Sequence, residues 1–499
     1  MPLPRRFNLS SSPRLALIAA ALLLAVATTI WLDREGLLPL REPAAPAPFA
    51  DGDTVVFLGD SITQNGRYLS YLRAFYLTRF PDRRIQFINA GIAGDTAARA
   101  RRRLAWDVFP HHPTAVALLF GMNDVQRGLY APGAAQPDLA DARSEALAAY
   151  RWNLEILARQ LAVHSNPRLI FVTPTPYDEG ADFASANHAG VNAALADGSA
   201  SVRRLARKYD GSLVELHRPM TDLNEEFQAV EPQFSIVGED RIHPGAPGHL
   251  LVAYHFLKAQ RVPTLVSDFV LDGATGAVVR ALNGRILHVD ATPDRLAFDV
   301  EEAALPFPID DEARAADAWL PIGADLSRQM LAVHFPGDAR YRLHIDDEFI
   351  ADFSADELRA GINLALLEHT PQMRQAQELL AAIEQCRLLE VQVRRYAQAH
   401  AALLEARVNP ESDTAVQAHI AAHLAALPPQ DRPYHRALFD HYRSRRLTID
   451  VDRAVLTARL GRLGELNRPR VHRYELAPIA PFRSPAKFAT ATPTFALAK

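Results

Sequence analysis

Cysteine is nearly absent from this chain. Cys386 is the only one in 499 residues, which excludes an internal disulfide bond and a zinc site built from several cysteines. It lies in an apolar helical pattern over residues 370–408, so we expect a small buried side chain there. The cysteine count by itself leaves the redox compartment of the protein open.

A strong charge of either sign is also missing. The formal net charge is −4, and 48% of the residues are hydrophobic and 22% charged, as in ordinary globular proteins. Binding to a nucleic-acid backbone calls for a basic face, so no nucleic-acid partner is expected. A chain of 499 residues is long enough to bury at least two hydrophobic cores.

The clearest long apolar run lies near the N-terminus. Leu15–Leu32 carries no charge and, as a helix, is about 27 Å long at ~1.5 Å per residue, which is about enough to span a bilayer. Arg5, Arg6 and Arg14 precede it, and the residues after it are nearly neutral. The positive-inside rule then places residues 1–14 in the cytoplasm. The sequence therefore predicts a single-pass transmembrane signal-anchor, with the bulk of the chain periplasmic or extracellular.

A cleaved signal peptide is the alternative for the same segment. The sequence AVA at residues 25–27 resembles a small-residue cleavage site, although the apolar run continues past it to Leu32. Cleavage there would make the protein secreted instead of anchored. In both cases the rest of the chain is exported, and residues 33–50, with their Pro/Ala stretch, form a linker.

Strand-like and helix-like patterns alternate over residues 51–263. The strand-like runs are short and apolar, and the stretches between them are long enough for helices. Repeated strand, helix, strand order predicts an α/β domain with a parallel sheet and helices on both faces. The predicted strands are 54–58, 85–88, 114–120, 168–173 and 212–216, and the predicted helices are 69–80, 96–109, 138–164, 191–209 and 246–259.

Hairpin patterns follow this first domain. Residues 277–290 and 341–353 are strand-like on both sides of a central pair of turn residues. These pairs are Asn283-Gly284 and Asp346-Asp347, and such residues are typical of two-residue hairpin turns. This part of the chain is therefore expected to be β-rich.

Helices are expected near the end of the chain. Long helical patterns begin near residue 370 and continue to about residue 468. We take residues 264–468 as one smaller accessory domain, β-rich and then α-helical. Residues 469–499 are rich in proline, alanine and threonine and are expected to form a poorly ordered tail.

One junction in the first domain raises a question of chemistry. The predicted strand at residues 54–58 runs into Gly59, Asp60 and Ser61, where turn-forming residues take over. Serine and aspartate are preferred helix N-caps, because their side-chain oxygens accept hydrogen bonds from free backbone N–H groups. The local pattern alone favours a capping role for Ser61, so a nucleophilic role needs support from elsewhere.

Other segments of the first domain supply that support. A nucleophilic serine needs a base, a group that orients the base, and donors for the oxyanion. Asp240 and His243 are three residues apart, so the carboxylate can reach one ring nitrogen and leave the other for Ser61. The glycines of residues 89–96 can present a backbone N–H, and Asn123 can present an amide directly after the third strand. In parallel sheets, ligands bind at the edge where the carboxyl ends of the strands lie. Ser61, residues 89–96 and Asn123 all follow predicted strands at that edge.

Four blocks follow one another in the domain: GDSIT (59–63), NAGIAGDT (89–96), GMND (121–124) and DRIHP (240–244). In order and approximate spacing they resemble the blocks of the SGNH (GDSL-type) hydrolases. The resemblance implies a flavodoxin-like, five-stranded parallel sheet and an esterase that needs no metal or cofactor. It implies Ser61 as nucleophile, His243 as general base and Asp240 as its orienting partner. The oxyanion hole would be the backbone N–H groups of Ser61 and Gly94 and the side chain of Asn123.

One residue departs from the family pattern. Many members have a glycine after the aspartate of the fourth block, where this chain has Arg241. We expect its side chain to shape the rim of the pocket. His249, one turn further on, is expected to pack against the start of a helix without reacting.

The leading hypothesis is an exported serine esterase that hydrolyses carboxylic esters through an acyl-enzyme. Its substrate would be a small-molecule or carbohydrate ester, with acylated cell-surface or extracellular carbohydrate as one candidate. A polysaccharide O-acyltransferase is an alternative, because a sugar hydroxyl can replace water in the same triad. A further alternative is a non-catalytic scaffold or binding protein. The oligomeric state does not follow from the sequence.

Overall fold

The computed structural model describes residues 20–28, 42–133, 138–292, 295–429 and 431–479. These residues fall into two compact units, and each unit draws on separate stretches of the chain. The first unit takes its described residues from Met1–Thr264, Phe307–Leu326 and Gln375–Arg468, and the second from Leu265–Pro306, Ser327–Arg374 and Pro469–Lys499.

The first unit is built on a parallel five-stranded sheet of order β2-β1-β3-β4-β5. This strand order is that of flavodoxin-like folds, so the expected α/β architecture is confirmed. Every predicted strand is present, with ends shifted by a few residues. The strands are β1 (Thr54–Gly59), β2 (Gln86–Gly91), β3 (Ala115–Leu119), β4 (Arg168–Val172) and β5 (Ser212–Val214).

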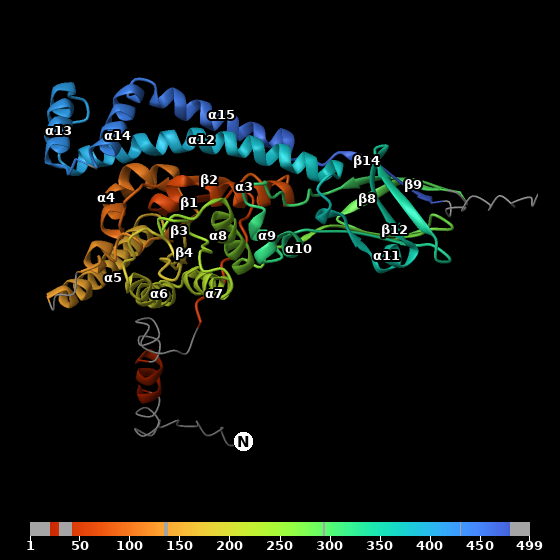
Figure 1. The fold of residues 1–499 in the computed structure, drawn as a ribbon, viewed down its shortest axis with the longest axis horizontal. Coiled ribbons are helices and arrows are strands. Elements are labelled where there is room, and N and C mark those ends of the chain that lie inside the picture. The colour runs from red at the N-terminus through yellow and green to blue at the C-terminus, as the bar shows by residue number, and fades with distance from the viewer. Residues whose placement is uncertain (1–19, 29–41, 134–137, 293–294, 430, 480–499) are drawn as a thin grey trace, which may run out of the picture. The chain divides into compact units, whose positions relative to one another are not determined.

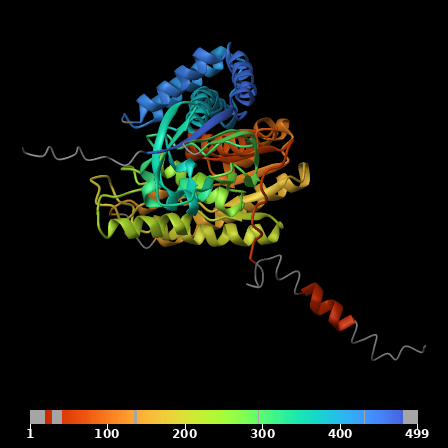
Figure 2. The ribbon, with the colours of Figure 1, turned by 90° about the vertical axis from the view of Figure 1, so that its right-hand side faces the viewer.

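Helices cover both faces of this sheet (Figures 1 and 2). In β1, Val55 and Phe57 enter one hydrophobic core and Val56 and Leu58 the other, because successive strand side chains point to opposite faces. Every helix predicted for this domain is found. The first core holds α3 (Arg67–Arg79), α7 (His217–Gln228) and α8 (Ala246–Ala259), and the second holds α4 (Ala97–Asp107), α5 (Asp138–His164) and α6 (Val191–Lys208).

A short stretch from the middle of the chain returns to the first unit. It carries α9 (Ala315–Trp319) and α10 (Ile322–Leu326), whose apolar residues enter the core beside α8. Tyr254 and Lys258 of α8 both donate to the Asp325 carboxylate, at 2.7 and 2.8 Å. The sequence shows no sign of this return, because it depends on which apolar surfaces meet.

The long C-terminal helix also belongs mainly to the first unit. α12 (Pro371–Glu405) confirms the helix predicted from residue 370, and from Gln375 onwards it packs with the parallel-sheet domain. Leu379, Ile383 and Cys386 are buried in the core that contains α3 and α8. The chain therefore divides differently from the single accessory domain expected over residues 264–468. The remaining helices are α13 (Asp413–Ala426), α14 (Arg432–Arg445) and α15 (Ile449–Leu466).

The second unit is β-rich and contains two sheets, of order β13-β10-β6-β7 and β12-β11-β14-β9-β8. Its core includes Leu271, Phe298 and Leu331. One short helix, α11 (Ala355–Ala360), follows β12. The strands are β6 (Leu265–Asp272), β7 (Val278–Leu282), β8 (Gly284–Thr292), β9 (Arg295–Glu302), β10 (Arg328–His334), β11 (Arg340–Ile345), β12 (Glu348–Ser354), β13 (Ile362–Asn363) and β14 (Val471–Pro478).

The two predicted hairpins have different outcomes. Asp346 and Asp347 have φ values of +52° and +65° and connect the antiparallel strands β11 and β12, which confirms that hairpin. Asn283 also has a positive φ, +54°, but β7 before it pairs with β6 and β8 after it pairs with β9. Its side chain donates to the Val266 carbonyl at 2.6 Å. The chain therefore passes from one sheet to the other at Asn283, and the predicted hairpin is wrong.

The expected C-terminal tail contains a central strand. β14 pairs antiparallel with both β9 and β11, so it lies inside the second sheet of this unit. Its alternate residues His472, Tyr474 and Leu476 are buried. The composition of the tail concealed this period-two pattern. The rest of the tail, residues 480–499, lies outside the described residues.

The predicted signal-anchor lies largely outside the described residues. Residues 20–28 are helical, whereas 15–19 and 29–32 are not described. Within the ranges that the structure describes, no helix combines the length and apolar character needed to cross a bilayer.

A buried ion pair joins α12 to α4. Arg394 donates to both carboxylate oxygens of Asp107 at 2.7 Å and to the Gly91 carbonyl at 3.0 Å. Both charged side chains are less than a tenth exposed, at 8% and 6%. Burial acts to raise the pKa of Asp107, but Arg394 and Arg103 outweigh it and hold that pKa below its usual value. The pair is therefore charged, and removing one partner leaves a buried charge with too few partners.

Arg394→Ala should lower the free energy of unfolding by about 3–5 kcal/mol, because the Asp107 carboxylate stays buried with one arginine fewer. Arg395→Ala is the matched control, since the described residues give that neighbouring arginine no ion pair, and it should cost under about 1 kcal/mol. Urea unfolding of the two variants measures the difference. Coincident unfolding curves would show that the pair contributes nothing to stability.

Candidate active site

Asp60 and Ser61 divide the two roles that the sequence left open. Asp60 Oδ1 accepts a hydrogen bond from the Ile62 N–H at 3.0 Å and so caps α2 (Ser61–Asn65). Ser61 is the first residue of that helix, and its Oγ lies 2.8 Å from Nε2 of His243. The serine is therefore not the cap, and its hydroxyl faces a base at the carboxyl end of β1.

Asp240 orients His243 from the other side of the ring. Its Oδ2 lies 2.5 Å from Nδ1 of His243, and its Oδ1 accepts from the backbone N–H groups of Ile242 and His243 at 3.0 and 2.9 Å. Burial acts to raise the pKa of Asp240, but the hydrogen bonds from His243 outweigh it and keep that pKa below its usual value. A charged carboxylate in this position favours the proton on Nδ1 and leaves Nε2 to accept from Ser61.

The two other predicted oxyanion donors lie on the loops after β2 and β3. Gly94 has a φ of +76° and is exposed, and within the described residues no acceptor receives its N–H. Asn123 Nδ2 donates to the Asp95 carbonyl at 3.0 Å. This bond uses one amide hydrogen and leaves the second for a ligand. Asn123 is thus tied to the residue next to Gly94, which brings the two predicted donors onto connected loops.

The site is open to solvent. The side chains of His243 and Asp240 are 46% and 53% exposed. A cavity of about 260 Å³ adjoins Asn123 and is lined by that residue and by Gln126 to Leu129. Water can therefore reach the base, and the space beside the amide is small.

The sequence of this region matches a known family. Residues 57–251, from β1 into α8, match the model of the GDSL-like lipase/acylhydrolase family. This region belongs to that family. The matched range contains the three predicted triad residues and the two predicted loop donors. Residues 57–251, called the acylhydrolase domain from here on, are therefore an ester-hydrolysing serine hydrolase.

Two known proteins are similar over different lengths. An acetylxylan esterase of Geobacillus stearothermophilus is 25% identical over 225 residues, which cover 42% of this chain and 93% of that protein. The solved structure of a gut microbial diltiazem-metabolizing enzyme has a TM-score of 0.79 and 27% identity, and it covers 87% of this chain and 100% of that one. The second likeness extends well beyond the acylhydrolase domain.

Arg241 does not shape the rim of the pocket, so that prediction is wrong. It is 2% exposed, and its guanidinium donates to the carbonyls of Asp178, Ala181 and Phe183 at 3.0, 2.9 and 3.1 Å. It therefore holds the loop that follows β4 against the fourth block. Its φ is +64°, a conformation that glycine adopts readily. The backbone at this position therefore suits the glycine that many family members have here.

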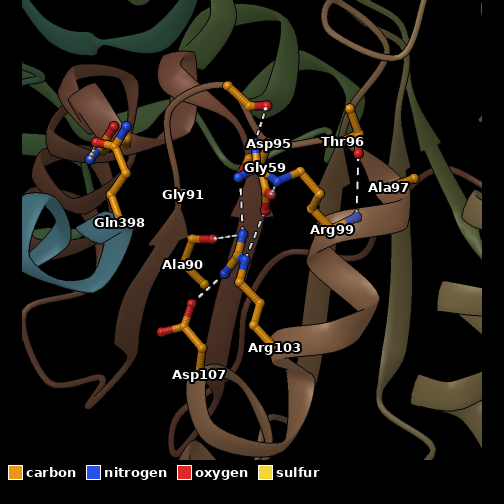
Figure 3. A network of polar contacts seen from close by, with 12 residues as sticks. Gly59, Ala90, Gly91, Asp95, Thr96, Ala97, Arg99, Arg103, Asp107 and Gln398 are labelled. Carbon is orange, nitrogen blue, oxygen red and sulfur yellow. Dashed lines mark hydrogen bonds and ion pairs between the residues drawn. The ribbon is translucent and has the colours of Figure 1, made fainter. Parts of the chain in front are cut away.

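Arg103 is a residue of the acylhydrolase domain that the sequence analysis missed. Its guanidinium donates to Asp95 Oδ2 and the Ala90 carbonyl at 2.8 Å and to the Gly59 carbonyl at 3.3 Å, and it pairs with Asp107 (Figure 3). One buried side chain thus links the ends of β1 and β2 to the loop that carries Gly94.

A signal for Arg103 was present in the sequence. The buried residues of α4 are Ala97, Ala100, Arg103, Leu104 and Asp107, which share one face of the helix. An arginine and an aspartate that fall on an apolar stripe indicate a buried ion pair. The run of three arginines at residues 101–103 hid this pattern, because such a run is typical of a solvated surface.

The other histidine near the site is structural, as expected. His249 is 2% exposed and stacks on Tyr68 with ring centroids 6.2 Å apart. Burial lowers the pKa of His249 to about 3, so it stays neutral. In the part of the chain that the structure describes, no three His, Cys, Asp or Glu side chains are placed to hold a metal ion.

Asp124 follows Asn123 and is buried behind the donor loops. Its Oδ1 accepts from the Ala97 N–H at 3.0 Å, at the start of α4, while its Oδ2 has no hydrogen-bond partner among the described residues. Burial, with the nearby Asp60 and Asp95 carboxylates, raises the pKa of Asp124 to about 8. Asp124 is therefore mostly protonated at pH 7.

Asp124→Asn should weaken the dependence of stability on pH. A folded pKa of about 8, raised from 3.8, means that the folded state binds more protons, so this group makes stability fall as pH rises from about 4 to 8. The asparagine keeps the acceptor for Ala97 and does not titrate. The gap in melting temperature between variant and parent should therefore grow in the variant's favour over that range. Asp141→Asn, which changes an exposed aspartate, is the control. A gap for Asp124→Asn that changes with pH no more than the gap of the control would contradict the assignment.

Proposed function

We propose that the acylhydrolase domain removes short acyl groups from carbohydrate esters through a Ser61 acyl-enzyme. The observation that carries this proposal is the relay from Ser61 Oγ to His243 Nε2 and from His243 Nδ1 to Asp240, at 2.8 and 2.5 Å. These are the contacts that a serine nucleophile, its base and the orienting carboxylate require.

The reaction follows from this geometry in two halves. His243 Nε2 takes the Ser61 proton as Oγ bonds to the ester carbonyl carbon, and the carbonyl π electrons move to oxygen. The N–H groups of Ser61 and Gly94 and the Asn123 amide stabilise that oxyanion. The tetrahedral intermediate then expels the alcohol, which takes the proton from His243. Water repeats the sequence on the acyl-enzyme and releases the acid.

The exposure of the triad favours hydrolysis over acyl transfer. Transfer to a sugar requires that water be kept from the acyl-enzyme, whereas His243 is 46% exposed. The similarity to an acetylxylan esterase supports a short acyl group. The similarity to an acetylxylan esterase, which covers 93% of that protein, supports a carbohydrate as the alcohol half of the ester.

The proposal is tested with an aryl acetate and an acetylated xylo-oligosaccharide. Ser61→Ala should abolish release of acetate from both substrates without changing the melting temperature. Asn123→Ala should reduce kcat by about 10²–10³, because it removes one oxyanion donor. Release of acetate by Ser61→Ala at the parent rate would overturn the proposal.

The same assay separates the alternatives. With a panel of aryl esters of graded chain length, hydrolysis should be fastest for the shortest acyl groups. Turnover that depends on an added sugar acceptor would favour the O-acyltransferase. No turnover of any ester would favour the scaffold or binding protein.

We also infer that the domain works outside the cytoplasm. The support is the sequence alone, namely the uncharged run Leu15–Leu32 behind Arg5, Arg6 and Arg14. Protease added to intact cells or spheroplasts should digest the domain, and carbonate-washed membranes should retain the chain if the segment is an anchor. Full protection of the domain until the cells are lysed would contradict export.

A further inference from the structure

The loop that carries Gly94 is a tight turn. The Asp95 N–H donates to the Ile92 carbonyl at 3.1 Å, so Ala93 and Gly94 are the two central residues. A positive φ at the second central residue, here +76° at Gly94, is characteristic of a type II turn. Type I and type II turns differ mainly by a flip of the central peptide, here the one between Ala93 and Gly94.

That central peptide decides where the proposed oxyanion donor points. The Ala93 carbonyl and the Gly94 N–H belong to one planar trans peptide, so they point in opposite directions. A contact that holds the Ala93 oxygen therefore aims the Gly94 hydrogen. Gly94 cannot fix this orientation itself, because it has no side chain and a Cβ there would meet no atom within 4 Å.

A side chain of α12 makes that contact. Gln398 Nε2 donates to the Ala93 carbonyl at 3.4 Å and to the Tyr434 hydroxyl of α14 at 3.0 Å. Gln398, which Figure 3 shows on α12, accepts through Oε1 from Nε2 of Gln64 at 3.3 Å. The amide is therefore held on both sides, and its donor group is directed at the turn.

Helix α2, which begins at Ser61, contacts the same turn through the N–H of Ala93. Gln64 lies in α2, three residues after Ser61, and its Oε1 accepts from the Ala93 N–H at 2.8 Å. The two glutamines thus hold both backbone groups of Ala93 and bond to each other. This arrangement connects the position of the nucleophile helix to the orientation of the Gly94 N–H.

We propose that Gln398 of the C-terminal helix α12 is a positioning residue for catalysis, which locks the Ala93–Gly94 peptide so that the Gly94 N–H faces the oxyanion. The proposal rests on the proposed function, because it needs Gly94 to be an oxyanion donor. Under this proposal α12 contributes a positioning side chain to the active site, although α12 lies outside the range that matches the family.

The test compares three variants of the full chain. Gln398→Ala removes the contact. Gln398→Glu keeps the size and the acceptor for Gln64 but cannot donate to the Ala93 oxygen. Gln385→Ala is the matched control, an exposed glutamine of the same helix. Both Gln398 variants should lose about tenfold in kcat on an aryl acetate with little change in KM, since a misaligned donor is a partial loss of the 10²–10³ that a whole donor supplies.

A second readout separates positioning from a general effect on folding. A boronic acid forms a tetrahedral adduct with a catalytic serine, and its affinity should fall about tenfold in both Gln398 variants and stay unchanged in Gln385→Ala. If the alanine variant does not fold, the glutamate variant carries the test.

Two outcomes are kept apart. Parent-like kcat and boronate affinity in Gln398→Glu, together with an inactive Ser61→Ala, would overturn the role of Gln398 and leave the proposed function intact. An active Ser61→Ala would overturn the proposed function, and this inference with it.

Discussion

The guanidinium of Arg103 is the group around which the edge of the parallel sheet is organised. Strands β1 and β2 end at this edge, at Gly59 and Gly91. Buried carbonyls need donors, and Arg103 supplies them to Gly59 and Ala90 at 3.3 and 2.8 Å. Its charge is balanced by Asp95 on the turn and Asp107 on its own helix. The strand ends, the turn and α4 are therefore fixed by one planar cation.

Charge pairing extends this organisation to the C-terminal helices. Asp107 accepts from Arg394 as well as from Arg103, so α12 is bound to α4 through a shared carboxylate. Arg394 also donates to the Gly91 carbonyl, one residue beyond Ala90. Leu379 and Ile383 of α12 are buried in the core that contains α3 and α8, and the buried ion pair of Arg394 joins the same helix to α4. The likeness to a solved enzyme over 87% of the chain fits an architecture in which these helices accompany the acylhydrolase domain.

Much of the fold and of the site could be predicted because the signals are local. Strand β1 is visible as a short apolar run, and the three-residue spacing of Asp240 and His243 brings a carboxylate to a ring nitrogen within one turn of chain. Local signals could not decide whether Ser61 is a helix cap or a nucleophile. Asp60 and Ser61 are both good caps, and only the position of His243, 182 residues further along the chain, shows which oxygen is left for catalysis.

What the sequence determined by itself is the alternation that builds the sheet and the order of the four blocks, because backbone periodicity and short spacings act within a few residues. What only the tertiary structure decided is which distant surfaces meet. Arg241 donates to carbonyls of the loop after β4, and Asn283 donates to the Val266 carbonyl where the chain passes between two sheets. Gln398 donates to the Ala93 carbonyl, 305 residues away in the chain. Each of these roles comes from a backbone carbonyl that needs a donor. The identity of that donor depends on packing, which no local pattern records.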